Sequence, residues 1–126
     1  MQYLLKSEPD QYSLSDLEHE GHTVWDGVAN PFAVRHLSEM KVGDKLVYYH
    51  TGDERQAVGT AVVFSVDVTD RKNPRVQIKY LHRISRPRKL AEIKAESIFA
   101  DSPLVKQGRL SVVPLTDEQY SWLTSG

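Results

Sequence analysis

Two short segments near the start of the chain hold the side chains best suited to binding a ligand. The segments Leu5–Asp10 and Val24–Pro31 combine charged, hydroxyl and aromatic groups with Gly, Pro and Asn residues that favour turns. Neither segment has the periodicity of an amphipathic strand or helix, so we expect both to be loops. Because loops on a rigid scaffold often carry binding groups, the two segments are candidate walls of one site.

Trp25 offers the largest flat surface in these segments. An indole ring at the mouth of a cavity stacks on a nucleobase with a gain of about 1–3 kcal/mol. Asp26, Gly27 and Asn30 follow closely and favour an exposed loop position for the ring. The alternative is that Trp25 packs in the core, as tryptophans commonly do, and the sequence leaves both possibilities open.

Lys6, Ser7 and Glu8 come directly after a short apolar strand, so they are expected at one end of the sheet. A hydroxyl, a carboxylate and backbone groups at that place would form hydrogen bonds with the edge of a flipped nucleobase. The alternative for Ser7 and Glu8 is that they stabilise the turn that precedes Pro9.

Residue patterns typical of enzymes and metal sites do not occur in the sequence. There is no glycine-flanked Ser elbow, HExxH, GxGxxG or GxxxxGK pattern, and there is no cysteine. The five histidines are scattered, at positions 19, 22, 36, 50 and 82. His50, beside Tyr49 at the end of a strand, is the one that would join a binding site, although a structural role is more common. The sequence therefore predicts no metal, no cofactor and no catalytic residue.

The net charge of −1 hides a strong asymmetry along the chain. Residues 1–70 contain 5 Lys and Arg against 12 Asp and Glu, whereas residues 71–126 contain 11 against 5. One stretch has eight basic residues and no acidic one: Arg71, Lys72, Arg75, Lys79, Arg83, Arg86, Arg88 and Lys89. Such clustering is typical of surfaces that bind nucleic-acid phosphates. The alternative is a solvated basic face that balances an acidic one.

Length and composition indicate one domain, residues 1–126, with 40% hydrophobic and 26% charged residues. No apolar run approaches the roughly 20 residues that a membrane helix needs, so no membrane partner is expected. The start of the chain has too few apolar residues for a signal peptide. We therefore expect a cytoplasmic protein.

The elements that must position these groups are mostly strands. Capping residues and helical periodicity predict helices over Leu14–Glu20, from Asn30-Pro31 onward, over Leu90–Ala95, and from Thr116 to Trp122. Alternation predicts strands over Tyr3–Leu5, Lys45–His50, Ala57–Val68, Val76–Ile84 and Leu110–Val113. Long strands without regular strand–helix alternation indicate an α+β fold, a small and mostly antiparallel β-barrel with short peripheral helices.

Several short motifs occur in a fixed order along essentially the whole chain. They are Lys6–Asp10, Trp25–Val28 with Asn30, Gly43-Asp44, Tyr49-His50 and Gly108–Val112. This set resembles the EVE domain family of the PUA-like superfamily, which is similar to the YTH modified-base readers. The resemblance implies a PUA-like barrel with a pocket for a modified nucleobase. Trp25 would form an aromatic wall there, and Ser7–Glu8 and Asp26–Asn30 would supply polar contacts.

The chain departs from the pattern of that family at positions that bear on the pocket. Ala29 stands where many members have an Arg, and Pro31-Phe32 stands where they have a Tyr-Gln pair. The insertion common after the middle strand is replaced by the short turn Asp70–Pro74, and Val76 takes the place of an aromatic residue. A second aromatic wall must then be absent or borrowed, and the nearest candidates are Phe32 and Tyr49.

These observations predict a non-catalytic module that binds DNA or RNA and holds a modified base against Trp25, while the basic stretch contacts phosphates. The predicted ligand-binding side chains are Lys6, Ser7, Glu8, Trp25, Asp26, Asn30, Phe32, Tyr49 and His50. One alternative is an enzyme, such as a nuclease, that uses Lys6, Glu8 or His50 as acid–base groups. Another is a protein that binds a free nucleoside or another small ligand.

Overall fold

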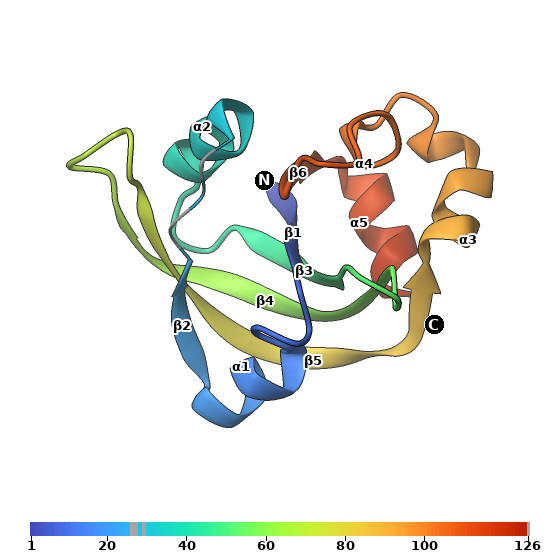
Figure 1. The fold of residues 1–126 in the computed structure, drawn as a ribbon, viewed down its shortest axis with the longest axis horizontal. Coiled ribbons are helices and arrows are strands. Elements are labelled where there is room, and N and C mark those ends of the chain that lie inside the picture. Colours follow the sequence, from blue (N-terminus) through green and yellow to red (C-terminus); the bar gives the residue numbers. More distant parts are fainter. Residues whose placement is uncertain (26–27, 29, 126) are drawn as a thin grey trace.

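A six-stranded sheet flanked by short helices forms the protein, as a computed structural model shows for residues 1–25, 28 and 30–125 (Figure 1). The strands are β1 (Gln2–Ser7), β2 (His22–Trp25), β3 (Lys45–His50), β4 (Gln56–Asp67), β5 (Arg75–Lys89) and β6 (Val112–Leu115). The helices are α1 (Leu14–Glu20), α2 (Pro31–Glu39), α3 (Leu90–Ala95), the 3₁₀ helix η1 (Ser97–Phe99), α4 (Pro103–Lys106) and α5 (Asp117–Thr124). Of the helices in these residues, none has the length and apolar character needed to cross a membrane.

The strands follow the order β2-β5-β4-β3-β1-β6 across the sheet. Neighbouring strands are antiparallel except β1 and β3, which run parallel, so the expected α+β class and mostly antiparallel pairing are confirmed. The expectation of a closed barrel is wrong, because the edge strands β2 and β6 do not pair within the described ranges. Each edge strand has only four residues and α2 packs against β6, which leaves no continuous hydrogen-bond ladder to close the sheet.

The sheet is strongly curved although it is open. Trp25 on β2 contacts Tyr48 on β3, with ring centroids 5.6 Å apart, although β5 and β4 lie between these strands in the sheet. The register shifts once between β3 and β4 and three times between β4 and β5, and such bulges bend strands. Alternation predicts that Val76, Ile78, Tyr80 and Ile84 of β5 face inward; three of them are buried and Tyr80 is half-buried.

Helix α1 lies close against the sheet at Gly59. A Cβ atom at position 59 would lie 2.5 Å from Leu14 Cδ2 and 3.1 Å from His82 O, so a glycine is needed for this approach. Ser13 and Asp16 form a capping box that begins α1. The helix therefore fixes the far end of the loop that follows β1.

Several elements have the predicted bounds, namely Leu14–Glu20, Lys45–His50 and Leu90–Ala95. The expectation that Val24–Pro31 is a loop throughout is wrong at its start, because β2 extends to Trp25. The residues of β2 alternate between exposed and half-buried, and four residues are too few for this alternation to be recognised in the sequence.

Candidate functional site

The parallel strands β1 and β3 end side by side and bring two segments of the chain together at one end of the sheet. Ser7, the last residue of β1, pairs with His50, the last residue of β3. Just beyond them, Thr51 N–H donates to Ser7 O at 2.9 Å, and the Thr51 hydroxyl donates to Glu8 Oε1 at 2.7 Å. The loop after β1 and the turn after β3 therefore form one continuous surface.

A pocket of about 570 Å³ opens at this end of the sheet, and we call it the Trp25 pocket. Its volume lies in the range of small-molecule sites, about 300–1,000 Å³. Its lining residues are Lys6, Ser7, Glu8, Gln11, Trp25, Val28, Asn30, Thr51, Gly108, Arg109 and Ser111. The structure thus brings together five of the predicted ligand-binding residues, Lys6, Ser7, Glu8, Trp25 and Asn30.

Trp25 is half-buried, because it packs against the core and also lines the pocket. Its ring meets the ring of Tyr48 edge to face, at an angle of 80°. The Tyr48 hydroxyl donates to Tyr12 O at 2.9 Å, and burial raises the pKa of Tyr48 to about 12, so this donor keeps its proton at neutral pH. The indole is therefore held in place before a ligand arrives, which reduces the entropy cost of binding.

Ser7 and Glu8 fix the turn of the loop after β1. Glu8 O accepts from the N–H groups of Gln11 and Tyr12, and the Ser7 hydroxyl donates to Tyr12 O at 2.7 Å. The Ser7 hydroxyl also lies within hydrogen-bond reach of the Tyr48 hydroxyl, and the Glu8 carboxylate has more acceptor positions than the one that Thr51 uses. The two residues therefore stabilise the turn and also line the pocket with acceptor atoms.

Lys6 is an anchored cation in the wall of the pocket. Its Nζ donates to Gly108 O at 2.9 Å and lies 5.9 Å from the centroid of the Tyr49 ring. Burial lowers the pKa of Lys6 from its ordinary value. An ammonium group has three donor protons and this carbonyl uses one, so Lys6 retains donors for an anion or a base.

Asn30 has a structural role beside its place in the pocket. Its Oδ1 caps α2 by accepting from the N–H groups of Phe32 at 2.9 Å and Ala33 at 3.2 Å. The carboxamide Nδ2 is then the group that Asn30 can offer to a ligand as a donor. Asp26, the other polar residue predicted in this segment, lies outside the described residues.

Three predicted ligand-binding residues are not brought into the lining of the Trp25 pocket. Phe32 is 60% exposed at the start of α2, so it does not belong to the core either. Tyr49 is buried and lines a smaller neighbouring pocket of about 250 Å³. His50 is buried and both of its ring nitrogens have partners: Nε2 accepts from Leu14 N–H at 3.0 Å, and Nδ1 lies 2.9 Å from Glu54 Oε1. His50 therefore supports the start of α1.

The basic stretch from residue 71 to residue 89 does not form one surface. β5 has 15 residues, and at about 3.3 Å per residue its two ends are about 45 Å apart along the strand. Arg71 and Lys72 lie in the turn between β4 and β5, at the upper left of Figure 1, whereas Lys89 lies at the opposite end of β5. The basic residues are therefore spread along β5 and the turn before it, and their contact with phosphates stays a prediction.

Two arginines of this stretch are engaged within the fold. Arg83 Nη2 lies 3.0 Å from Glu18 Oε1, which connects β5 to α1. Arg88 Cζ lies 4.5 Å from the centroid of the Trp122 ring, and Arg88 Nη1 lies 3.9 Å from Glu92 Oε2. Both side chains therefore contribute to packing between elements, which a count of charges along the sequence does not reveal.

Sequence reasoning missed four polar residues that line the pocket, namely Gln11, Thr51, Arg109 and Ser111. Arg109 and Ser111 reach the pocket because β6 pairs with β1, and Lys6 N–H donates to Ser111 O at 2.9 Å. The motif Gly108–Val112 was visible in the sequence, but its place beside Lys6 depends on pairing between strands more than 100 residues apart.

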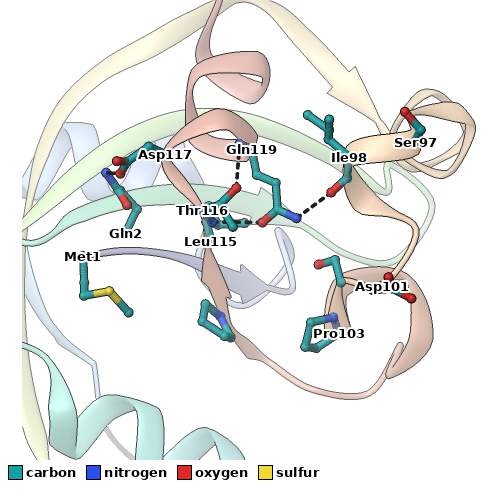
Figure 2. A pocket seen from close by; sticks show the side chains of 12 residues that line it. Met1, Gln2, Ser97, Ile98, Asp101, Pro103, Leu115, Thr116, Asp117 and Gln119 are labelled. Carbon is teal, nitrogen blue, oxygen red and sulfur yellow. Dashed lines mark hydrogen bonds between the residues drawn. The ribbon is translucent and has the colours of Figure 1, made fainter.

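A hollow of about 620 Å³ lies between β6, the start of α5 and the segment from η1 to α4 (Figure 2). Its amide side chains are already paired: Gln2 Nε2 donates to Asp117 Oδ1 at 2.7 Å, and Gln119 Nε2 donates to Ile98 O at 2.8 Å. Its charged side chains are Asp101 and Asp117, with no Lys or Arg among the described lining residues. The Trp25 pocket is therefore the better candidate for a nucleic-acid ligand.

Comparisons with known proteins agree with the fold. A model of the EVE domain family matches residues 2–125. The NMR structure of Rpa0253 from Rhodopseudomonas palustris is 35% identical, with a TM-score of 0.89 over 98% of this chain and 90% of that chain. The crystal structure of human THYN1 protein in complex with DNA containing 5-methylcytosine is 24% identical, with a TM-score of 0.87 over 98% of this chain and 95% of that chain. At this level of identity, the similarity is one of fold. Thymocyte nuclear protein 1 of Gallus gallus is 27% identical over 98% of this chain and 67% of its own length.

Proposed function

The chain belongs to the EVE domain family, and we propose that it binds nucleic acid and holds a modified nucleobase in the Trp25 pocket, without catalysing a reaction. 5-Methylcytosine in DNA is the first ligand to test, because human THYN1, which has the same fold, was solved with DNA that contains this base.

The observation that carries the proposal is the half-buried indole of Trp25 in the wall of a pocket that several polar side chains also line. A flipped base needs an aromatic surface against its face and hydrogen-bonding groups around its edge. Lys6 and Arg109 add positive charge, and Glu8 is the single carboxylate among the described lining residues. This balance favours a base that is attached to phosphate over an uncharged small molecule.

An enzymatic role has less support from the geometry. Catalysis by a nucleophile or an acid–base pair requires the reacting groups to lie within hydrogen-bond reach of each other. The candidate groups are instead bonded to separate partners in the described structure: Lys6 to Gly108 O, Glu8 to the Thr51 hydroxyl, and His50 to Leu14 N–H. These bonds position the loops around the pocket.

The test is fluorescence anisotropy with two labelled single-stranded oligonucleotides, one with a single 5-methylcytosine and one with cytosine at that position. The wild-type protein should bind the modified strand more tightly. Trp25→Ala should weaken this binding by about 5- to 150-fold, the equivalent of about 1–3 kcal/mol. Phe32→Ala is the matched control, because it removes an exposed aromatic ring that does not line the pocket, and its Kd should be unchanged.

Trp25 also packs on Tyr48, so thermal unfolding must confirm that each variant is folded. Trp25→Phe keeps a smaller ring and should have intermediate affinity. Equal binding of both strands by the wild-type protein, or a Trp25→Ala protein that binds as the wild type does, contradicts the proposal. Binding of the free nucleoside as tight as that of the strand would favour the small-ligand alternative.

A further inference from the structure

A smaller pocket of about 250 Å³ adjoins the Trp25 pocket and shares Lys6, Thr51 and Gly108 with it. We call it the cationic pocket, because Lys6, Arg55 and Lys94 line it and no acidic residue is among its described lining residues. Leucine side chains, from the start of α3 and from α4, supply its apolar surface. A pocket with three cations and apolar walls suits an anionic group that is attached to a less polar body.

The backbone of Arg55 is fixed in an unusual conformation. Its φ of 47° lies in the left-handed region, which is uncommon for a residue other than glycine. Arg55 O accepts from Leu90 N–H at 2.8 Å, and Arg55 Nε donates to Gly52 O at 3.3 Å. The turn after β3 is therefore clamped to the start of α3, and this clamp holds the guanidinium group at the pocket.

The cations of this pocket form no ion pair in the described structure, although Glu8, which accepts from the Thr51 hydroxyl, reaches Gly52 in the pocket wall. Within the described ranges, neither Arg55 nor Lys94 has a carboxylate oxygen within ion-pair distance. Asp53 and Glu54 line another hollow together with Arg55 and Lys94, and Glu54 is also bonded to His50. Like charges that are held together without a counterion favour the binding of an anion.

Tyr49 lines this pocket together with Lys6 and Arg55. Burial raises the pKa of the Tyr49 phenol, and the positive charge of Arg55 acts against this rise. Lys6 Nζ lies 5.9 Å from the centroid of the same ring. Lys6 therefore lies beside Tyr49 and also lines the Trp25 pocket.

We propose that the cationic pocket binds the phosphodiester group next to the recognised base, with Lys6, Arg55 and Lys94 as its positive contacts. This inference rests on the proposed function, because it places the base of the same nucleotide in the Trp25 pocket. Lys6 lies at the boundary of the two pockets and contacts the ligand between base and phosphate. All three of these residues lie outside the basic stretch from residue 71 to residue 89.

The test compares 5-methyl-2′-deoxycytidine with its 5′-monophosphate and its 3′-monophosphate by calorimetry. The site variant is Arg55→Asn with Lys94→Gln, because Asn tolerates the left-handed backbone at position 55. The matched control is Arg71→Asn with Lys72→Gln, which removes the same charge from the distant turn between β4 and β5. Each variant is first checked for folding by thermal unfolding.

One of the two monophosphates should bind the wild-type protein about tenfold or more tightly than the nucleoside does, since charge-assisted hydrogen bonds are the strong ones. The site variant should lose this gain and keep its affinity for the nucleoside, while the control variant should keep both. The monophosphate that gains identifies the side of the base, 5′ or 3′, on which the phosphate binds.

A site variant that keeps the tighter binding, or a control variant that loses it equally, overturns the inference. So does a wild-type protein that binds neither monophosphate better than the nucleoside. If the nucleoside does not bind but inorganic phosphate binds the wild-type protein and not the site variant, the proposed function fails and the phosphate site stands. Should the double variant not fold, Lys94→Gln alone must weaken binding of the same monophosphate, and an unchanged Kd overturns the inference.

Discussion

His50→Ala should destabilise the fold without removing a contact to the ligand. His50 Nε2 accepts the N–H of Leu14 at 3.0 Å, at the buried start of α1, and Nδ1 lies 2.9 Å from Glu54 Oε1. This arrangement requires the neutral tautomer with its proton on Nδ1, which donates to the carboxylate. His50 then has no nitrogen left for a reaction or for a base.

The expected loss follows from the surroundings of the ring. An unpaired buried N–H group at Leu14 costs about 1–3 kcal/mol. The space left by an imidazole that is 7% exposed and packed edge-on against Tyr48 adds about 1 kcal/mol. The bond to Glu54 adds little, because the side chain of Glu54 is 41% exposed. The free energy of unfolding should therefore fall by about 2–4 kcal/mol.

Urea unfolding measures this loss as a lower midpoint with an unchanged slope. Glu54→Gln is the control: it keeps an acceptor for Nδ1 and should change the free energy of unfolding by less than about 1 kcal/mol. Where His50→Ala is folded, its Kd for the modified strand should equal that of the wild-type protein. A His50→Ala protein of unchanged stability that no longer binds would refute this reasoning and return His50 to the site.

Gly59→Ala should lower the free energy of unfolding by about 1–3 kcal/mol, because the added Cβ would lie 2.5 Å from Leu14 Cδ2; Gly108→Ala, which has open space at its Cβ, should leave the urea midpoint unchanged. Burial lowers the pKa of Lys6, so as the pH rises its ammonium loses its proton before an ordinary lysine with a pKa of 10.5 does. As the pH is raised, the affinity of the wild-type protein for the strand should begin to decrease before pH 10.5 is reached, and the affinity of Lys6→Arg should not. Identical pH profiles of the two proteins would contradict this. Val76 is fully buried, and no second aromatic residue lines the described part of the Trp25 pocket. With one aromatic wall, the Kd for the modified base should be micromolar, which corresponds to a binding free energy of about −8 kcal/mol. A nanomolar Kd would show that the pocket is built differently.

Local chemistry was enough to predict most of the elements. Ser13 with Asp16 and Thr116 with Gln119 form the capping boxes that their spacing indicated, and Asn30 caps α2. Whether the sheet closes depends on a meeting between β2 and β6, which lie far apart in the sequence. No local pattern records that meeting, so the family resemblance and the strand count suggested a barrel where the sheet is open.

The same distinction explains the candidate site. Lys6 and Ser7 were predicted because they follow the apolar residues Tyr3–Leu5, although they belong to β1 and not to a loop. Trp25 was predicted because turn-forming residues follow it in the sequence. Arg55 and Arg109 were not predicted. The left-handed backbone of Arg55 places it at the cationic pocket, and the pairing of β6 with β1 places Arg109 at the Trp25 pocket. The charge count along the sequence does not show how the basic residues lie in space, because it ignores the length of β5, which separates the two ends of the stretch.

A fluorescence titration of Trp25 alone decides whether a modified base binds against its ring. The chain has two tryptophans, and Trp122 packs between Phe99 and Arg88, outside the lining of the Trp25 pocket. Trp122→Phe therefore leaves Trp25 as the single indole. Adding the 5-methylcytosine strand should change the emission of this protein saturably, with the Kd found by anisotropy, and should leave the emission of Trp25→Phe unchanged. Saturable binding of the modified strand that leaves the emission of Trp25 unaltered would contradict a base held against Trp25.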